Sequence, residues 1–280
     1  MVSACERRRQ VAYAVGRGLS TRRACALLSV ARSSLDYESK LAARDAGVLK
    51  QISELVKANP RFGYRRIQAL LERKSVSMSR DRMCRLWRQG KHQIRRKRRR
   101  RRLQEPQPRL KAATRPNHVW AYDFIHDSCA HGRKLKCLVV VDEWTRECLA
   151  IEVGGRIPAR RVKEVLERLF EEHGHPEFFR SDNGPEFIAK NLGKWLVERE
   201  IGTAFIEPGK PWQNGSVESF NDKFRDECLN MEWFRSREEA KLKIEIWRRR
   251  YNEHRPHSSL GYRTPNEFKE SCLRGQNLPG

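Results

Sequence analysis

Eight consecutive basic residues, at positions 95–102, constrain the fold of this chain more than any other feature of its sequence. Such a run repels itself and offers no apolar side chain to a core, so we expect it to be extended until a polyanion neutralises it. Pro106 and Pro108 follow and are typical of a linker. No single core can continue through residues 95–115, so the 280-residue chain has at least two parts.

The excess of basic residues lies almost entirely in the front of the chain. Residues 1–112 hold 31 Lys and Arg against 8 Asp and Glu, whereas residues 113–280 hold 28 against 27. A nucleic acid is the expected partner, because each phosphate that Lys or Arg neutralises releases condensed counterions. The alternative is a nonspecific basic tail. A membrane surface is less favoured, because the basic residues lie among short helices with Gly and Ser breaks.

The compartment follows from what the sequence lacks. No stretch of about 18 apolar residues occurs and no apolar secretion segment opens the chain, so we expect a cytoplasmic protein with no membrane partner. The eight cysteines contain no Cys-x-x-Cys pair, which favours free thiols. A zinc site is the alternative, drawn from His126, Cys129, His131 and Cys137.

Residues 1–45 have the pattern of a helix-turn-helix DNA-binding segment. One helical stretch stops at residues 16–18, Ser20 is placed to cap a second helix over 21–28, and a third helix is expected over 31–37. The last helix of such a motif enters the major groove, so Arg32 is a candidate DNA contact. Any small helical bundle would give the same pattern.

Residues 46–94 predict a second helical DNA-binding unit. A turn at residues 59–66 places three arginines and two aromatic residues at a helix start, which suits phosphate contacts. The aromatic pair, Phe62 and Tyr64, would equally suit a core. The candidate DNA contacts are Arg61, Arg65 and Arg66 here, and Arg95, Arg96, Lys97, Arg98 and Arg99 in the basic run.

From residue 116 to 272 the pattern predicts an α/β core with C-terminal helices. Three strands with short connections, at 118–125, 136–142 and 147–153, should pair antiparallel. A helix from Pro158, a strand at 177–180, a helix from Pro185 and a strand at 204–206 follow, and another helix opens at 214–216. This is the order of an RNase H-like core, a mixed five-stranded sheet with helices.

Three acids stand at positions where this fold would bring them together. Asp123 interrupts the apolar first strand, Asp182 follows the fourth strand, and Glu218 lies in the first turn of the later helix. Clustered carboxylates need a divalent cation, and hard oxygen ligands favour Mg²⁺ or Mn²⁺. Two ions would support in-line phosphoryl transfer. Taken singly, Asp182 could be a turn residue and Glu218 a helix N-terminal acid.

The spacing of these acids carries a family resemblance. Thirty-five residues separate Asp182 from Glu218, and Arg225 follows seven residues later. This resembles the D,D-35-E pattern of retroviral integrases and bacterial insertion-sequence transposases. With the segments Ser-Asp-Asn-Gly-Pro-Glu-Phe at 181–187, Pro-Gly-Lys-Pro-Trp-Gln-Asn-Gly at 208–215 and His-Arg-Pro-His-Ser-Ser-Leu-Gly-Tyr at 254–262, almost the whole chain is similar to the catalytic protein, OrfB, of the third large family of bacterial insertion sequences.

The resemblance implies a DNA transposase that exposes a 3′-hydroxyl at an element end and joins it to another DNA strand. It also implies a homo-oligomer on DNA, a bacterial nucleoid location, and a partner from an upstream frame, OrfA, or a fusion with it. Two other functions stay open: a non-catalytic DNA-binding repressor, and an RNase H-type nuclease, which would not explain the basic front.

Neighbours of the acids also have expected roles. On one helix Glu218, Asn221 and Arg225 share a side, beside an apolar stripe that would hold the helix on the sheet. Arg225 would meet a DNA phosphate or form an ion pair with Asp222. Lys210 is a candidate DNA contact in a loop that is either a flap or a simple connection. The rival acids are Asp127, expected near or beyond the end of its strand, and Asp142, expected to bind backbone at a turn. The stripe comprises Val217, Phe220, Phe224 and Cys228.

Overall fold

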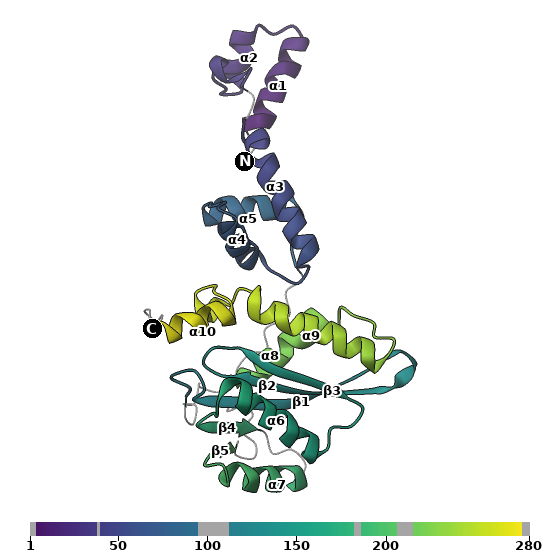
Figure 1. Cartoon of the computed structure of the whole chain (residues 1–280). Helices are drawn as coiled ribbons and strands as arrows, with labels where there is room; N and C mark the ends of the chain where they lie inside the picture. The colour runs from purple at the N-terminus through teal and green to yellow at the C-terminus, as the bar shows by residue number, and fades with distance from the viewer. Residues whose placement is uncertain (1–3, 38–39, 95–111, 182–185, 206–214, 276–280) are drawn as a thin grey trace, which may run out of the picture. The chain divides into compact units, whose positions relative to one another are not determined.

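The computed structural model describes residues 4–37, 40–94, 112–181, 186–205 and 215–275 (Figure 1). By its internal contacts the chain divides into two compact units, Met1–Glu54 and Leu55–Gly280. Helix α3 (Leu41–Ala58) covers the predicted boundary at residues 45–46. The division into four functional segments stays a prediction.

The first unit holds the greater part of α3, two shorter helices before it and a small core. α1 (Ala4–Gly16) and α2 (Thr21–Leu27) form where the sequence predicts them, and the Ser20 side chain caps α2 by accepting from the Arg23 N–H at 3.4 Å. The predicted third helix is instead a single 3₁₀ turn, η1 (Arg32–Ser34). Ser34 explains the difference in part, since its hydroxyl donates to the Ala31 carbonyl at 2.7 Å and competes with helical bonding.

The second unit begins with two amphipathic helices, α4 (Tyr64–Arg73) and α5 (Arg80–Gln89). Ser79 caps α5 through the Arg82 N–H at 3.3 Å, as its sequence position predicts. The apolar residues at helical spacing are buried, namely Ile67, Leu71, Met83, Leu86 and Trp87.

A five-stranded sheet forms the centre of the second unit, in the order β3-β2-β1-β4-β5. The first three strands pair antiparallel, and β4 and β5 run parallel to β1. This confirms the RNase H-like α/β core expected from the sequence. The strands are β1 (Val119–Ser128), β2 (Lys134–Asp142), β3 (Cys148–Gly154), β4 (Phe178–Ser181) and β5 (Gly202–Phe205).

Helices cover both faces of the sheet (Figure 1). One face packs against α6 (Ala159–His173) and α7 (Glu186–Val197), and the other against α8 (Gly215–Phe224) and α9 (Arg237–Glu253). β1, β2 and β3 each supply residues to both cores, because successive side chains point to opposite faces. On β1, Trp120 lies in the α6 core and Ala121 in the α8 core.

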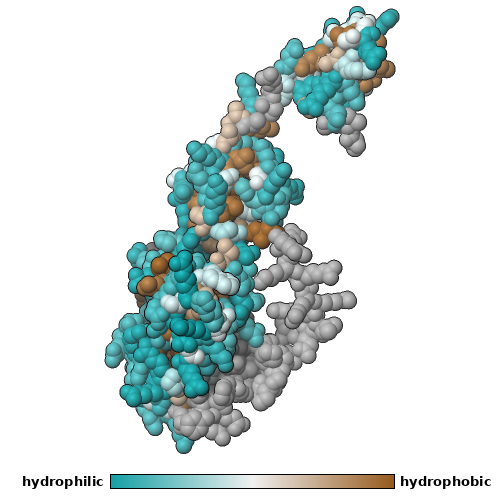
Figure 2. All heavy atoms as spheres, turned by 90° about the vertical axis from the view of Figure 1, so that its right-hand side faces the viewer, coloured by the Kyte–Doolittle hydropathy of each residue, from teal (hydrophilic) through white to brown (hydrophobic). Residues whose placement is uncertain are grey.

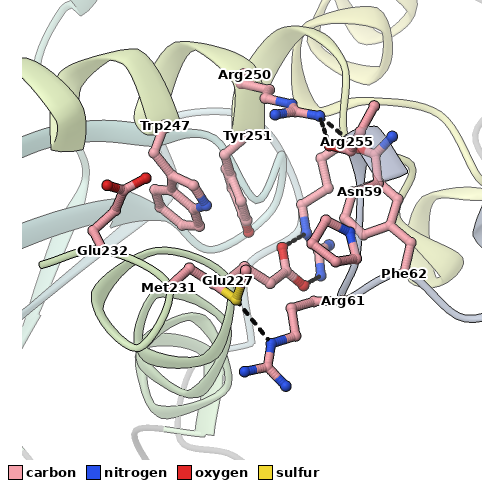
Figure 3. Close-up of a pocket in the computed structure, with 12 residues that line it drawn as sticks. Asn59, Arg61, Phe62, Glu227, Met231, Glu232, Trp247, Arg250, Tyr251 and Arg255 are labelled. Carbon is pink, nitrogen blue, oxygen red and sulfur yellow. Dashed lines mark hydrogen bonds and ion pairs between the residues drawn. The ribbon is translucent and has the colours of Figure 1, made fainter. Parts of the chain in front are cut away.

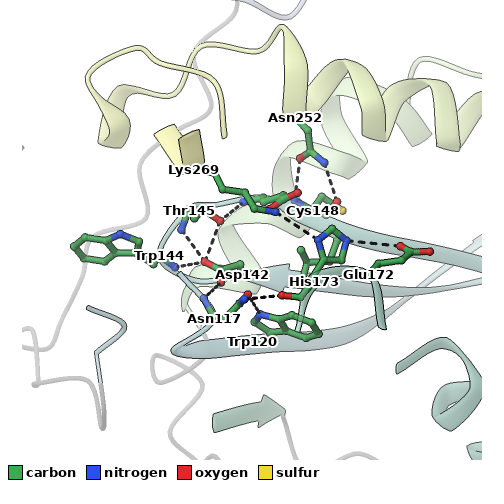
Figure 4. A network of polar contacts seen from close by, with 12 residues as sticks. Asn117, Trp120, Asp142, Trp144, Thr145, Cys148, Glu172, His173, Asn252 and Lys269 are labelled. Carbon is green, nitrogen blue, oxygen red and sulfur yellow. Dashed lines mark hydrogen bonds and ion pairs between the residues drawn. The ribbon is translucent and has the colours of Figure 1, made fainter. Parts of the chain in front are cut away.

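The C-terminal segment is tied back to the edge of the sheet. After α9 come a 3₁₀ turn, η5 (Ser258–Leu260), and α10 (Pro265–Leu273), which opens with a capping box between Thr264 and Glu267. The amide of Asn252 on α9 bonds the backbone N–H and the carbonyl of Cys148 on β3, both at 2.9 Å (Figure 4). The edge strand is therefore held by a side chain that satisfies its backbone.

The surface is mostly hydrophilic in the view of Figure 2, with apolar residues scattered over it. Among the helices that the structure describes, none has both the length and the apolar character needed to cross a bilayer.

All eight cysteines are free thiols, and most of them are buried. This confirms the expectation of free thiols. No three metal-ligating side chains of the described residues gather into a site, so nothing there supports the zinc alternative.

Phe224 is the clearest test of how α8 is held on the sheet, because it is fully buried in the core that the sheet shares with α8 and α9. We expect Phe224→Ala to lower the free energy of unfolding by roughly 3–5 kcal/mol, from lost burial and the cavity left behind. Urea denaturation would measure the change. Leu242→Ala on α9 is the control, since Leu242 is 69% exposed. Equal stability of the two variants would contradict this packing.

Candidate active site

Asp123 lies in the middle of β1, opposite Val139 of β2. Its side chain shares the sheet face of Ala121 and Ile125, which is the face that α8 covers. One carboxylate oxygen accepts from the Phe124 N–H at 2.7 Å. The other accepts from Nδ2 of Asn221 on α8 at 2.5 Å. The half-buried acid is therefore oriented from two directions.

Glu218 occupies the first turn of α8, three residues before Asn221, so the two side chains lie on one side of the helix. Its side chain is exposed. Partial burial and the neighbouring Asp222 carboxylate raise the pKa of Glu218. The hydrogen bond from Asn221 to Asp123 thus brings the acid-bearing side of α8 against the strand acid.

Asp182, the third predicted acid, lies outside the described residues, as does Lys210. The strand that leads to Asp182 is described. β4 runs parallel to β1, and the last described pair of that ladder joins Ala121 to Arg180. Asp123 and Asp182 each follow that pair by two residues.

The described donors fit a hard divalent cation. Besides the two carboxylates, Oδ1 of Asn221 is buried and has no hydrogen-bond partner among the described residues. A buried amide oxygen without a partner is energetically costly unless it coordinates a cation or accepts a hydrogen bond. An all-oxygen set of this kind is what Mg²⁺ or Mn²⁺ prefers.

Asp127 lies closer to the sheet than expected. β1 continues to Ser128, and Asp127 still pairs with Leu135 inside the ladder, so its expected place beyond the sheet is corrected. The longer pairing arises because β2 begins at Lys134 and matches β1 to its end. Four residues along a strand correspond to about 13 Å, which keeps Asp127 apart from Asp123.

Asp142 has the structural role that its turn position predicts (Figure 4). Its Oδ1 accepts from the backbone N–H groups of Trp144 and Thr145 at 2.9 and 2.7 Å, and its Oδ2 accepts from the Asn117 N–H at 2.8 Å. Burial raises the pKa of Asp142, while these hydrogen bonds oppose that effect. A carboxylate with both oxygens committed to backbone is no rival metal ligand.

Arg225 lies where α8 widens into a π-helical turn, η4 (Arg225–Leu229). Its guanidinium donates to the His126 carbonyl at 3.3 Å, and the described residues show no ion pair between Arg225 and Asp222. π-helical turns inside α-helices are frequent at functional sites. The extra residue in the turn shifts the residues that follow Arg225 relative to Glu218, which a regular helical pattern does not anticipate.

The other predicted DNA contacts are spread over the described structure. Arg32 is exposed on η1, and Arg65 lies over the Tyr64 ring. Arg61 reaches the Met231 sulfur at 3.2 Å. Arg66 forms an ion pair with Glu227 at 3.3 Å. The contacts predicted in the basic run lie outside the described residues, namely Arg95, Arg96, Lys97, Arg98 and Arg99.

A buried ion pair that the sequence did not predict joins η4 to the chain after α9. Arg255 donates to both oxygens of Glu227 at 2.6 Å, and only 3% of the Arg255 side chain is exposed (Figure 3). The Arg255 guanidinium also lies 5.8 Å from the Phe62 ring, and Phe62 is buried. Arg250 on α9 donates to the Ala58 carbonyl at 2.6 Å. Phe62 is therefore a core residue, the second of the two roles considered for it.

Two integrase core domain models match the chain, at residues 113–211 and 199–265. The uncharacterized 31.7 kDa protein of insertion element IS407 from Burkholderia multivorans is 40% identical over 250 residues, which span 89% of this chain and 90% of the relative. The uncharacterized 39.2 kDa protein of IS476 from Xanthomonas euvesicatoria is 38% identical over 89% of this chain and 72% of its own length. Transposase InsD of IS2D from Escherichia coli is 27% identical over 80% and 78%.

Solved structures give weaker matches. A simian T-cell lymphotropic virus intasome in complex with a PP2A regulatory subunit has a TM-score of 0.49, at 18% identity over 64% of this chain and 63% of that one. The HTLV-2 integrase catalytic core with magnesium has a TM-score of 0.43, at 17% identity over 56% and 99%. The two insertion-element relatives at 40% and 38% identity each cover 89% of this chain. This chain therefore belongs to the insertion-sequence transposases of the third family, DDE-type polynucleotidyl transferases built on an integrase core.

Proposed function

We propose that this transposase cuts and joins DNA at insertion-sequence ends with Asp123, Asp182 and Glu218 as its metal-binding carboxylates. One observation carries the proposal. Asn221, one helical turn after Glu218, donates a hydrogen bond to Asp123, which lies 95 residues before Glu218 in the chain. A strand acid and a helix acid thus approach one place, as shared metal binding requires.

The parallel ladder supports the inclusion of Asp182. In neighbouring parallel strands, residues that follow a paired position by the same number lie beside each other on one face of the sheet. Asp123 and Asp182 stand two residues after the pair formed by Ala121 and Arg180. Their two carboxylates would therefore lie beside each other on the face that α8 covers.

The two ions that we propose, Mg²⁺ or Mn²⁺, would supply an activated water or 3′-hydroxyl and stabilise the leaving oxygen. The residues of the chain orient these donors. Asn221 fixes the Asp123 carboxylate through Nδ2, and its buried Oδ1 has no hydrogen-bond partner among the described residues. The apolar residues of α8 hold Glu218 beside it, because Phe220 and Phe224 are buried in the sheet core.

DNA would be held mainly by the basic front of the chain and by Arg225 beside the acids. We propose DNA contacts for Arg32, Arg61, Arg65 and Lys210, and for the basic run at 95–102. Arg66 would have to share its guanidinium between DNA and Glu227. We further propose that the chain works as a homo-oligomer on DNA in the bacterial cytoplasm, at the nucleoid, with an upstream-frame protein or a fusion to it.

Charge-removing substitutions at the three acids test the proposal. We expect Asp123→Asn, Asp182→Asn and Glu218→Gln each to reduce cleavage and joining of a labelled element end to background, because the metal loses a ligand. Affinity for the same DNA in EDTA should be unchanged. Cleavage by a variant that binds DNA normally would contradict the assignment. If the wild-type protein binds but never cleaves, the repressor alternative replaces it.

Asn221 tests the orientation of Asp123. We expect Asn221→Ala to reduce cleavage by about 10–100-fold, the usual cost of losing a residue that orients a metal ligand. Cleavage should also need more Mg²⁺ to reach half its maximum, which a general loss of stability would not cause. Asn230→Ala, an exposed asparagine just after η4, is the control. An unchanged Mg²⁺ requirement in Asn221→Ala would reject the orienting role.

A further inference from the structure

A basic cavity lies on the flank of α8 that faces away from the acids. Its volume is about 240 Å³. It is enclosed by α8, by α4, by the turn between β2 and β3, and by the segment after α9. The polar lining residues that carry the argument are Arg66, Arg146, Ser216, Ser219, Lys223 and Arg255.

The helical spacing of α8 separates this cavity from the acids. Ser216, Ser219 and Lys223 follow one another at intervals of three and four residues, so they share one flank. Glu218 and Asn221 lie on the opposite flank. The buried apolar side chains between the two flanks face the sheet. One helix therefore presents carboxylates on one flank and cations with hydroxyl groups on the other.

Cations outnumber acids around the cavity. Arg66, Arg146, Lys223 and Arg255 line it, and none of its described lining residues is an acid. Glu227, just outside the lining, accepts from Arg255 and Arg66. Among the residues that the structure describes here, four cations and one carboxylate leave an excess of positive charge, which an anion would neutralise.

The electrostatics of Lys223 reflect this crowding. The pKa of Lys223 is lowered to about 8, mainly by burial and then by the guanidinium groups of Arg255 and Arg66. The Glu227 carboxylate raises this pKa and so partly opposes the shift. Burial and the same cations lower the pKa of His257 to about 2, so this side chain is neutral and does not contribute charge. A bound anion would favour the charged form of Lys223.

Hydroxyl groups are positioned to complete an oxyanion site. The guanidinium of Arg146 donates to Oγ of Ser216 at 2.8 Å, and the ammonium of Lys223 donates to Oγ of Ser219 at 2.6 Å. A serine hydroxyl can accept from a cation and also donate its own proton to an oxyanion. Ser258 and Ser259 line the same cavity from η5. Guanidinium, ammonium and hydroxyl donors together are the groups that bind phosphate oxygens.

We propose that this cavity binds a backbone phosphate of the DNA, one that is not at the bond being cut. The choice of DNA as the anion rests on the proposed function. A helix with its side chains is about 10 Å across, so a phosphate on this flank lies beyond the reach of ligands shared with Glu218. The site would position the strand across α8 while the acids act on a different phosphate.

The test is DNA binding by the full chain in EDTA, where no cleavage can occur. Fluorescence anisotropy with a labelled duplex would be followed over a range of KCl concentrations. For Lys223→Gln we expect several-fold weaker binding and a slope of log affinity against log salt that is smaller by about 0.9, the value for one lost phosphate contact. Lys223→Arg should restore both. Arg160→Gln on α6, the opposite side of the sheet, is the matched control.

Inorganic phosphate separates DNA from a free anion as the ligand. We expect phosphate to raise the melting temperature of the wild type, but not of Lys223→Gln, relative to chloride at equal ionic strength. If phosphate stabilises the wild type while Lys223→Gln binds DNA as tightly as the wild type does, the site takes a free anion and the proposal is wrong.

A folded Lys223→Gln protein with wild-type affinity and salt slope would also overturn the proposal. If Lys223→Gln has a lower melting temperature than the wild type, Arg146→Gln provides the second measurement. DNA affinity and the salt slope are then measured for that variant. Asp123→Asn distinguishes this proposal from the catalytic one. Its DNA binding in EDTA should equal that of the wild type, and a protein that never cleaves would still show the Lys223 effect.

Discussion

The packing of α8 against the sheet is the contact on which the rest of the site depends. Val217, Phe220 and Phe224 are almost completely buried in one core with residues of β1 and β2. Because they fix the rotation of the helix, they decide which side chains face the strand acid and which face away. Asn221 reaches Asp123 only in this rotation, and Glu218 lies on the same side of the helix. A turn of the helix by one residue, about 100°, would exchange these partners.

The pair formed by Glu227 and Arg255 adds a second, electrostatic constraint directly after α8. Burying two charges is costly, and the bidentate geometry with both bonds at 2.6 Å is what offsets that cost. Removing Glu227 would leave the buried Arg255 without its carboxylate partner, so the ends of α8 and α9 are held in one arrangement. The same arginine lines the basic cavity. Fold and charge distribution are thus coupled at one side chain.

The sequence predicted the elements with local signals and not the contacts made over long distances. The order of the elements along the chain and the caps by Ser20 and Ser79 follow from periodicity and from side chains near each terminus. The pair of Asp123 with α8 followed from the fold that those elements imply. Arg255 and Glu227, 28 residues apart, carry no local pattern. Nor does the π-helical turn at Arg225, which depends on packing. The ion pair of Arg66 with Glu227 carries no local pattern either, because the two residues lie 161 positions apart.

The two flanks of α8 have opposite electrostatic needs, which explains why one helix serves both. Carboxylates repel DNA and are useful only where a cation neutralises them, whereas Lys223 and Arg146 attract DNA without help. Glu218 and Lys223 are five residues apart, and the buried stripe separates their flanks. If the basic cluster lay on the acid flank, its cations would pair with Asp123 and Glu218. They would then compete with the metal ions for these carboxylates. The separation keeps each group available for its own ligand.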